Sequence, residues 1–117
     1  MIRNAIIIRI DYKIGSNAEG QSKFSEEPPI ALPCFLAPYS EIKWQLGAAV
    51  KDCSETVFVM DDDFATAAIP HRPGIGDRIV ARFNDEADTA AVAMEIVLAR
   101  PNKLGSISHL ELFLKKV

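Results

Sequence analysis

The chain has 117 residues, of which 49% are hydrophobic and 25% are charged, and its formal net charge is −3. This length predicts one domain over residues 1–117 with a single hydrophobic core. No apolar run approaches the roughly 18 residues of a membrane span, and Met1 leads into a β pattern without a secretory cleavage site, so we expect a cytosolic protein with no membrane partner.

Charge is unevenly distributed along the chain. Residues 61–99 hold three Lys or Arg against eight Asp or Glu, whereas residues 100–117 hold four against one. The simplest interpretation is that both regions are solvated faces. Alternatively, an acidic face on one subunit meets a basic edge on the next, which would set the register of a head-to-tail ring.

The first half of the chain predicts two strands separated by a long polar excursion. Residues 5–12 are rich in β-branched side chains and predict the first strand. Residues 13–29 form either a disordered loop or a hairpin arm that contacts a partner, with Phe24 as its single aromatic residue. Residues 30–37 predict the second strand, in which Pro33 favours an edge or a bulge.

A second excursion follows over Tyr39 to Cys53. Ser40 is placed to cap a short helix over residues 41–46, which Gly47 would end. Residues 54–60 then predict a strong third strand. Asp61, Asp62 and Asp63 are expected to form an acidic turn at its end, because three consecutive carboxylates do not converge on one cation. Residues 64–69 predict a short strand or loop.

The last third of the chain predicts an antiparallel meander of three strands. These strands cover residues 76–83, 90–100 and 109–114, with a turn over 84–88 and a break over 101–106. Each strand has one apolar face that needs a covering surface, made by Ile79, Ala81 and Phe83, by Val92, Met94, Ile96 and Leu98, and by Leu110, Leu112 and Leu114. The whole pattern predicts a mainly β fold: a small antiparallel barrel or sandwich of about six or seven strands with one short helix and two long loops.

No pattern in the sequence indicates an enzyme. Neither His71 nor His109 lies at catalytic spacing from a nucleophile, and His109 is expected to form a hydrogen bond near the start of the last strand. The glycines at 74 and 76 lack a phosphate-loop lysine. Cys34 and Cys53 match no metal spacing and are expected to be buried thiols. We therefore predict no catalytic residues, no metal and no cofactor.

The order of these segments resembles the small head-closure, or stopper, proteins of tailed bacteriophages, which belong to the head–tail connector. The resemblance covers nearly the whole chain. It lies in five segments taken together: the strand Ile6-Ile7-Ile8-Arg9-Ile10, the segment Cys34-Phe35-Leu36-Ala37-Pro38-Tyr39-Ser40-Glu41 with its Pro-x-Ser ending, the strand Thr56-Val57-Phe58-Val59, the strand start Gly76-Asp77-Arg78-Ile79, and the final strand His109-Leu110-Glu111-Leu112-Phe113-Leu114-Lys115-Lys116.

The resemblance implies a structural protein of a phage or prophage that assembles into a ring, expected to be dodecameric, below the portal and its adaptor. Such a ring closes the channel on packaged double-stranded DNA by steric obstruction and backbone contact, and it docks the tail protein. The expected location is the head–tail interface of the virion, and the host cytoplasm during assembly. The implied channel-closing loop comprises Tyr39, Ser40, Glu41, Ile42, Lys43, Trp44, Gln45, Leu46, Gly47 and Lys51.

The polar excursion and the charge pattern predict where subunits or partners meet. The residues expected at such an interface are Phe24, Asp61, Asp62, Asp63, Lys103, Lys115 and Lys116. Trp44 is either half-buried in the core or an anchor between subunits. The alternatives to a stopper are a tail-completion or tail-terminator protein of the same connector and a monomeric small-barrel binding module, which net negative charge and core-patterned aromatic residues disfavour for nucleic acid.

Overall fold

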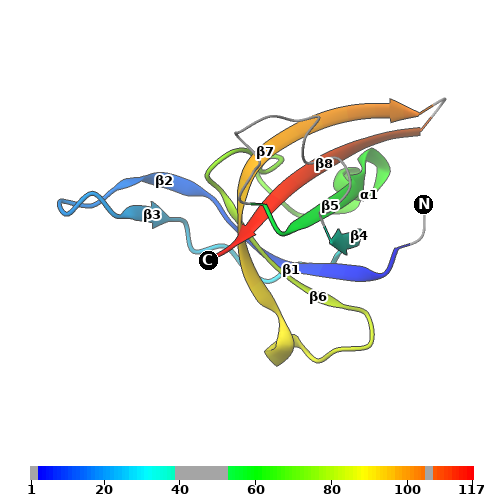
Figure 1. Cartoon of the computed structure of the whole chain (residues 1–117), viewed down its shortest axis with the longest axis horizontal. Coiled ribbons are helices and arrows are strands. Elements are labelled where there is room, and N and C mark those ends of the chain that lie inside the picture. The colour runs from blue at the N-terminus through cyan, green and yellow to red at the C-terminus, as the bar shows by residue number, and fades with distance from the viewer. Residues whose placement is uncertain (1–2, 39–52, 105–106) are drawn as a thin grey trace.

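A computed structural model describes residues 3–38, 53–104 and 107–117, and in it six strands close into one antiparallel barrel (Figure 1). Around the barrel the strands follow the order β1, β4, β5, β8, β7, β6. The predicted small β-barrel is therefore confirmed. The bounds of these strands are β1 Ala5–Asp11, β4 Leu32–Pro38, β5 Glu55–Met60, β6 Arg78–Phe83, β7 Val92–Leu104 and β8 Ile107–Lys116.

The barrel interior is filled by alternate residues of all six strands, as the period-2 pattern predicts. The predicted inward face of the last strand is confirmed, since Leu110, Leu112 and Leu114 are all buried. The alternation fails at one end of the barrel, where Phe83 and Val92 remain 41% and 44% exposed. These two side chains were expected to be covered with the rest of their strand faces.

The predicted meander is present as β6, β7 and β8, but the predicted break at Pro101 is wrong. Strand β7 continues through Pro101 to Leu104 and pairs with β8 over its whole second half. Proline is tolerated there because β6 pairs with β7 only between Val92 and Glu95, which leaves one edge of the remaining strand without a strand neighbour. The result is a long β7–β8 ribbon that extends beyond the barrel (Figure 1).

Pro33 obeys the same rule on the other side of the barrel. It pairs with Ile6 of β1, whereas β5 pairs with β4 only from Phe35 onward. The predicted edge position of Pro33 is thus confirmed, although the barrel as a whole is closed.

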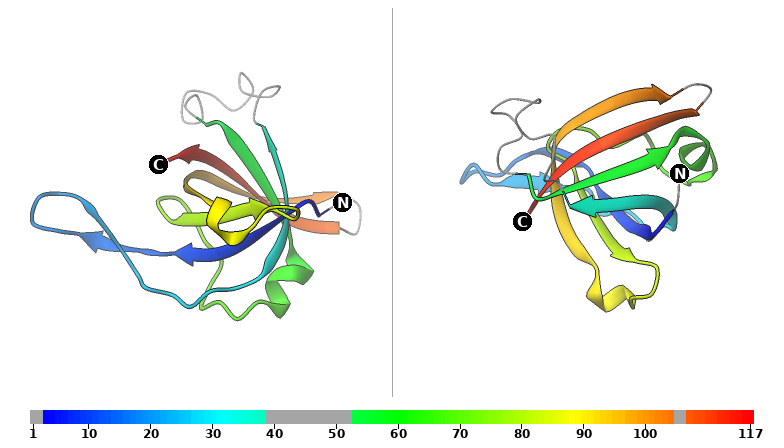
Figure 2. Two further views of the ribbon diagram at one scale, coloured as in Figure 1. Left: turned by 90° about the horizontal axis from the view of Figure 1, so that it is seen from below. Right: turned by 45° about the vertical axis from the view of Figure 1, so that its right-hand side comes forward.

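Residues 13–29 contain a hairpin that stands outside the barrel. Strands β2 (Lys13–Ser16) and β3 (Ser22–Phe24) pair only with each other. In Figures 1 and 2 this hairpin projects from one end of the molecule, and the tip of the β7–β8 ribbon lies at the other. We call the hairpin, residues 13–24, the arm.

The predicted acidic turn after β5 is instead a short helix, α1 (Asp61–Thr66). Three aspartates occupy its first turn, where carboxylates interact favourably with the exposed backbone N–H groups. Phe64 is 6% exposed and joins the barrel core, which fixes the helix on the end of the barrel. A three-residue 3₁₀ turn, Asp88–Ala90, lies between β6 and β7. The helix predicted over residues 41–46, with Ser40 as its cap, lies outside the described residues.

Candidate partner-binding surfaces

The predicted channel-closing residues cannot be placed, because they all lie outside the described part of the chain. They are Tyr39, Ser40, Glu41, Ile42, Lys43, Trp44, Gln45, Leu46, Gly47 and Lys51. The residues that flank this segment are described. Pro38 at the end of β4 pairs with Glu55 at the start of β5, so the segment leaves and rejoins the barrel at neighbouring positions.

The arm is fastened firmly at its base. Asp77 is almost fully buried and accepts hydrogen bonds from the backbone N–H of Lys13 and of Gly74, both at 2.8 Å. The backbone N–H groups of Tyr12 and Ser25 add a pair of bonds across the base, since Tyr12 donates to Ser25 Oγ at 3.1 Å and Ser25 donates to the Tyr12 carbonyl at 2.8 Å. Buried charge-assisted bonds of this kind hold a loop in one direction.

Beyond this base, the two strands of the arm pair only with each other among the described strands. Every residue of β2 is exposed, and Ile14 is 65% exposed. Phe24, predicted to meet a partner, lies at the base instead, where the guanidinium of Arg78 stacks 4.3 Å from its ring centre. The Phe24 ring is therefore engaged within the subunit. Ile14 is the large hydrophobic residue that the arm exposes.

The predicted acidic interface is partly neutralised within the subunit. Asp63 accepts hydrogen bonds from the Arg3 guanidinium at 2.7 and 3.2 Å, and Asp61 pairs with Arg72 at 2.9 Å. Asp62 is exposed on α1. The helix therefore presents fewer unpaired carboxylates than its sequence suggests.

The three predicted basic residues do not form one patch. Lys103 is exposed near the tip of the β7–β8 ribbon, whereas Lys115 and Lys116 lie at the opposite end of β8. Lys115 pairs with Glu95 at 3.3 Å, and Lys116 lines a groove. The structure thus separates the predicted interface residues into the arm base, α1 and the two ends of the ribbon.

The groove at the Lys116 end was not predicted from the sequence. It has a volume of about 350 Å³ and opens beside the two exposed apolar residues Phe83 and Val92. Its wall also includes Leu36, Pro38, Glu55, Ala81, Arg82, Glu86, Ala90, Met94 and Lys116. The sequence contains a pattern that could have predicted this groove: two large apolar residues, Phe83 and Val92, flank an acidic turn at the ends of two strands. We call this surface the apolar groove.

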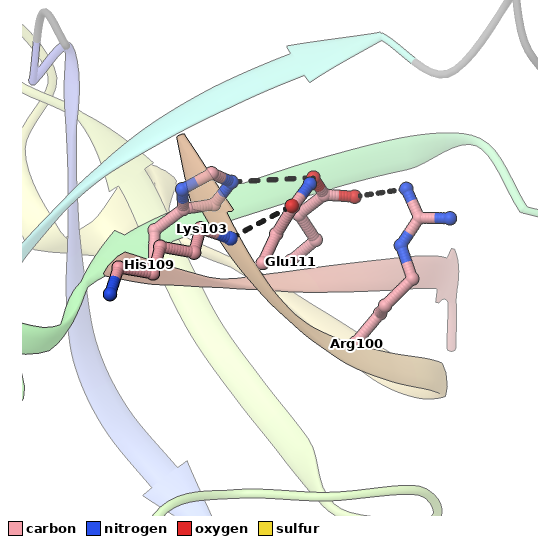
Figure 3. A network of polar contacts seen from close by, with 5 residues as sticks. Arg100, Lys103, His109 and Glu111 are labelled. Atoms are coloured by element: carbon pink, nitrogen blue, oxygen red, sulfur yellow. Dashed lines mark hydrogen bonds and ion pairs between the residues drawn. The ribbon is translucent and has the colours of Figure 1, made fainter. Parts of the chain in front are cut away.

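A buried polar network on the β7–β8 ribbon was only partly foreseen (Figure 3). Glu111 is 5% exposed and accepts hydrogen bonds from Arg100 at 2.8 Å and Asn102 at 2.7 Å. His109 Nε2 lies 3.3 Å from the same carboxylate, which confirms the hydrogen bond expected for this histidine. Burial opposes ionisation, but the bonds from Asn102, Arg100 and His109 and the charge of Arg100 outweigh it and lower the pKa of Glu111. The Glu111 carboxylate is therefore ionised at neutral pH, and it stabilises the ribbon through these hydrogen bonds.

Both cysteine side chains are buried, as predicted, and burial raises the pKa of the Cys34 thiol to about 12. Such a thiol is protonated at neutral pH and is a poor nucleophile. Among residues 3–38, 53–104 and 107–117, no group of three or more His, Cys, Asp or Glu is placed to hold a metal ion. No described helix is long and apolar enough to cross a bilayer.

Comparison with known proteins finds no matching family model, no matching curated protein and no matching solved structure.

Proposed function

We propose that this chain is a structural subunit of a phage or prophage head–tail connector, which forms a ring below the portal or adaptor, closes the DNA channel after packaging and docks the tail. In this role the protein acts by obstruction and docking and performs no chemistry. Its partners are further copies of itself, the adaptor, a tail protein and the packaged DNA.

The observation that carries the proposal is the arm. A closed barrel completes its own hydrogen bonding and core, so it gains nothing from a projecting hairpin whose residues are exposed. Ordering such a hairpin costs conformational entropy, and burial of its exposed side chains against a partner would add to the stabilisation that the β2–β3 pairing and the bonds at its base provide. The arm is held at its base by Asp77 and exposes Ile14 to solvent. These are properties expected of a subunit that contacts its neighbours in an assembly.

The position of residues 39–52 supports the stopper role over other connector roles. Pro38 and Glu55, which flank this segment, are paired neighbours, so the described strands β4 and β5 stay joined up to the two points where the segment is attached. A scaffold that carries a separate channel plug needs such a junction. In the proposal these residues form the part that closes the channel.

The decisive experiment replaces residues 39–52 with a short Asn-Gly turn in the phage or prophage that encodes the chain, leaving the β4–β5 pair intact. Particles are then examined by electron microscopy and for nuclease-sensitive DNA. We expect heads that package DNA and then lose it. An unaltered genome is the control, and circular dichroism of the purified variant verifies the barrel.

The outcome also separates the two connector roles. Filled, stable heads without tails after complete deletion of the gene would favour a tail-completion protein. Normal infectious particles after complete deletion would refute a connector role altogether.

A further inference from the structure

We infer that the arm of one subunit inserts Ile14 into the apolar groove of a neighbouring copy, beside Phe83 and Val92. The occupant of the groove is thus a second copy of this chain. The inference rests on the proposed function in that it assigns the contact between adjacent subunits of the ring.

The arm provides an apolar side chain without a place in its own subunit. Ile14 is 65% exposed although it lies in an ordered strand, and the base of the arm is fixed by the two backbone bonds to Asp77. Gly76, at a φ of +91°, allows the turn beneath the arm, where an added Cβ would lie 3.3 Å from the Lys13 side chain. The direction of the arm is therefore set before any partner binds, which reduces the entropy lost on association.

The groove provides an exposed apolar surface in the described part of the chain. Phe83 and Val92 are among the few large hydrophobic residues that are exposed in the described part of the chain, and they lie on the same groove. A volume of about 350 Å³ is within the range of binding clefts and holds an aliphatic side chain together with parts of its strand. Burying Ile14 there removes apolar surface from water on both sides.

The charges around the two surfaces are complementary. The arm, residues 13–24, carries Lys13 and Lys23 against the single Glu19. The turn beside the groove, residues 84–88, carries Asp85, Glu86 and Asp88 with no basic residue. Glu86 lines the groove itself. Asp88 is paired with Arg82, and the groove wall holds Arg82 and Lys116 as well as Glu55 and Glu86. The attraction for the slightly basic arm therefore comes from Asp85 and Glu86 of the turn, and it favours this orientation over arm-to-arm contact.

The two surfaces share no residue, and Figure 1 shows the arm and the β6–β7 turn pointing in different directions from the barrel. Two subunits that exchanged arms reciprocally would close as a two-fold dimer, whereas in a ring each arm enters the groove of the next copy in one direction, which is the heterologous arrangement that we infer. Repetition of such a contact produces a closed ring or an open filament, whereas a two-fold contact would stop at a dimer.

The test uses one full-length chain that carries both Ile14→Cys and Val92→Cys. On mild oxidation at high protein concentration, we expect a reducible ladder of dimer, trimer and larger species on a denaturing gel. The matched control is Ile75→Cys with Val92→Cys, since Ile75 is 68% exposed but lies outside both surfaces. The buried native cysteines are controlled for by oxidising the unaltered chain.

The possible results separate this contact from its alternatives. Dimers alone from the double variant would indicate a two-fold contact, either a reciprocal exchange of arms or a pairing of like surfaces, in place of the one-directional contact of a ring. A monomer with an internal disulfide would place the arm on its own groove, and the control ladder at equal yield would show random collision. Each of these results, or no cross-linking at all, would overturn the inference.

A second variant separates failure of the contact from failure of the proposed function. Ile14→Asp should abolish binding of the chain to filled, adaptor-bearing heads, whereas Ile75→Asp should leave it unchanged. Heads that bind Ile14→Asp as well as the unaltered chain would overturn the contact but keep the connector role. A ladder from a chain that ignores heads would support the contact and remove the connector role.

Discussion

Glu111 is a buried carboxylate that accepts hydrogen bonds from several polar side chains. Glu111→Ala would leave Arg100, Asn102 and His109 without their shared acceptor, and we expect the free energy of unfolding to fall by about 1–3 kcal/mol. Urea denaturation followed by circular dichroism measures this. The control is Glu95→Gln, which breaks a more exposed pair with Lys115 and should cost no more than about 1 kcal/mol.

The same residue predicts a pH dependence. The pKa of Glu111 is lowered in the folded chain relative to its usual value of 4.5, so the unfolded chain binds this proton more readily. The stabilisation is therefore complete well above pH 4.5 and is lost as the pH falls through the folded-state pKa. Urea titrations across this acid range should show a steeper loss of stability for the unaltered chain than for Glu111→Gln. Equal slopes would contradict the assignment.

Asp77 controls the arm through backbone bonds alone. Asp77→Ala would remove the acceptor of the two part-buried hydrogen bonds that the backbone N–H groups of Lys13 and Gly74 donate, at a cost of about 1–3 kcal/mol for the pair. Native-state hydrogen exchange should show both amides exchanging faster, while amides of β8 change less. Asp85→Ala, at an exposed position of the β6–β7 turn, is the matched control and should change neither amide.

At the residue scale the sequence predicted what lies inside the barrel better than what lies at its ends. Leu110, Leu112 and Leu114 follow the strand period, and the barrel buries them. Phe83 and Val92 follow the same period but are exposed, because each lies at a strand end where the barrel offers no further partner. Local alternation specifies a face of a strand, and it does not specify how far the neighbouring strands extend.

At the scale of elements, two predictions were wrong for the same reason. The acidic segment after β5 became helix α1 because Phe64 packs into the core. Strand β7 continued through Pro101 because its pairing with β6 stops at Glu95, opposite the first residue of β6, and leaves an edge. Both outcomes depend on tertiary neighbours that are distant in the sequence. For residues 13–29 the sequence allowed either a disordered loop or a hairpin arm that contacts a partner. The bond from Lys13 to Asp77, far along the chain, holds the base of a hairpin, and contact with a partner stays a prediction.

The arm is expected to be dispensable for folding. Replacing residues 14–23 with an Asn-Gly turn keeps the paired positions Lys13 and Phe24 and removes only residues outside the core. The free energy of unfolding should change by less than about 1 kcal/mol, since exposed residues contribute little and the shorter loop closes more easily. Urea denaturation measures this. A much larger loss would show that the arm supports its own barrel.

For the whole molecule, charge pairing limits contact with nucleic acid. The six ion pairs in the described residues that join a Lys or Arg to a carboxylate engage Arg3, Arg9, Arg72, Arg82, Arg100 and Lys115. With a net charge of −3, the isolated subunit should bind duplex DNA with a dissociation constant no tighter than about 100 µM at physiological salt. Fluorescence anisotropy across a salt series measures this, and tight, salt-sensitive binding would contradict it.

The isolated subunit is also expected to be a monomer or a weak oligomer that forms its ring on a template. Exposed Ile14 and a small groove offer too little area for a stable interface in dilute solution. Size-exclusion chromatography with light scattering at micromolar concentration should give the monomer mass of 12.9 kDa. A stable ring without a template would contradict this expectation.

The place of β8 in the barrel has a consequence for how the protein is made. Residues 107–116 form hydrogen bonds with β5 on one side and β7 on the other, so the barrel cannot close until these residues have been synthesised. During translation the earlier strands must wait for this segment to emerge from the ribosome, with their apolar faces unprotected. A nascent chain arrested before residue 107 should therefore be a substrate for chaperones and proteases, and it should become resistant once the segment has emerged.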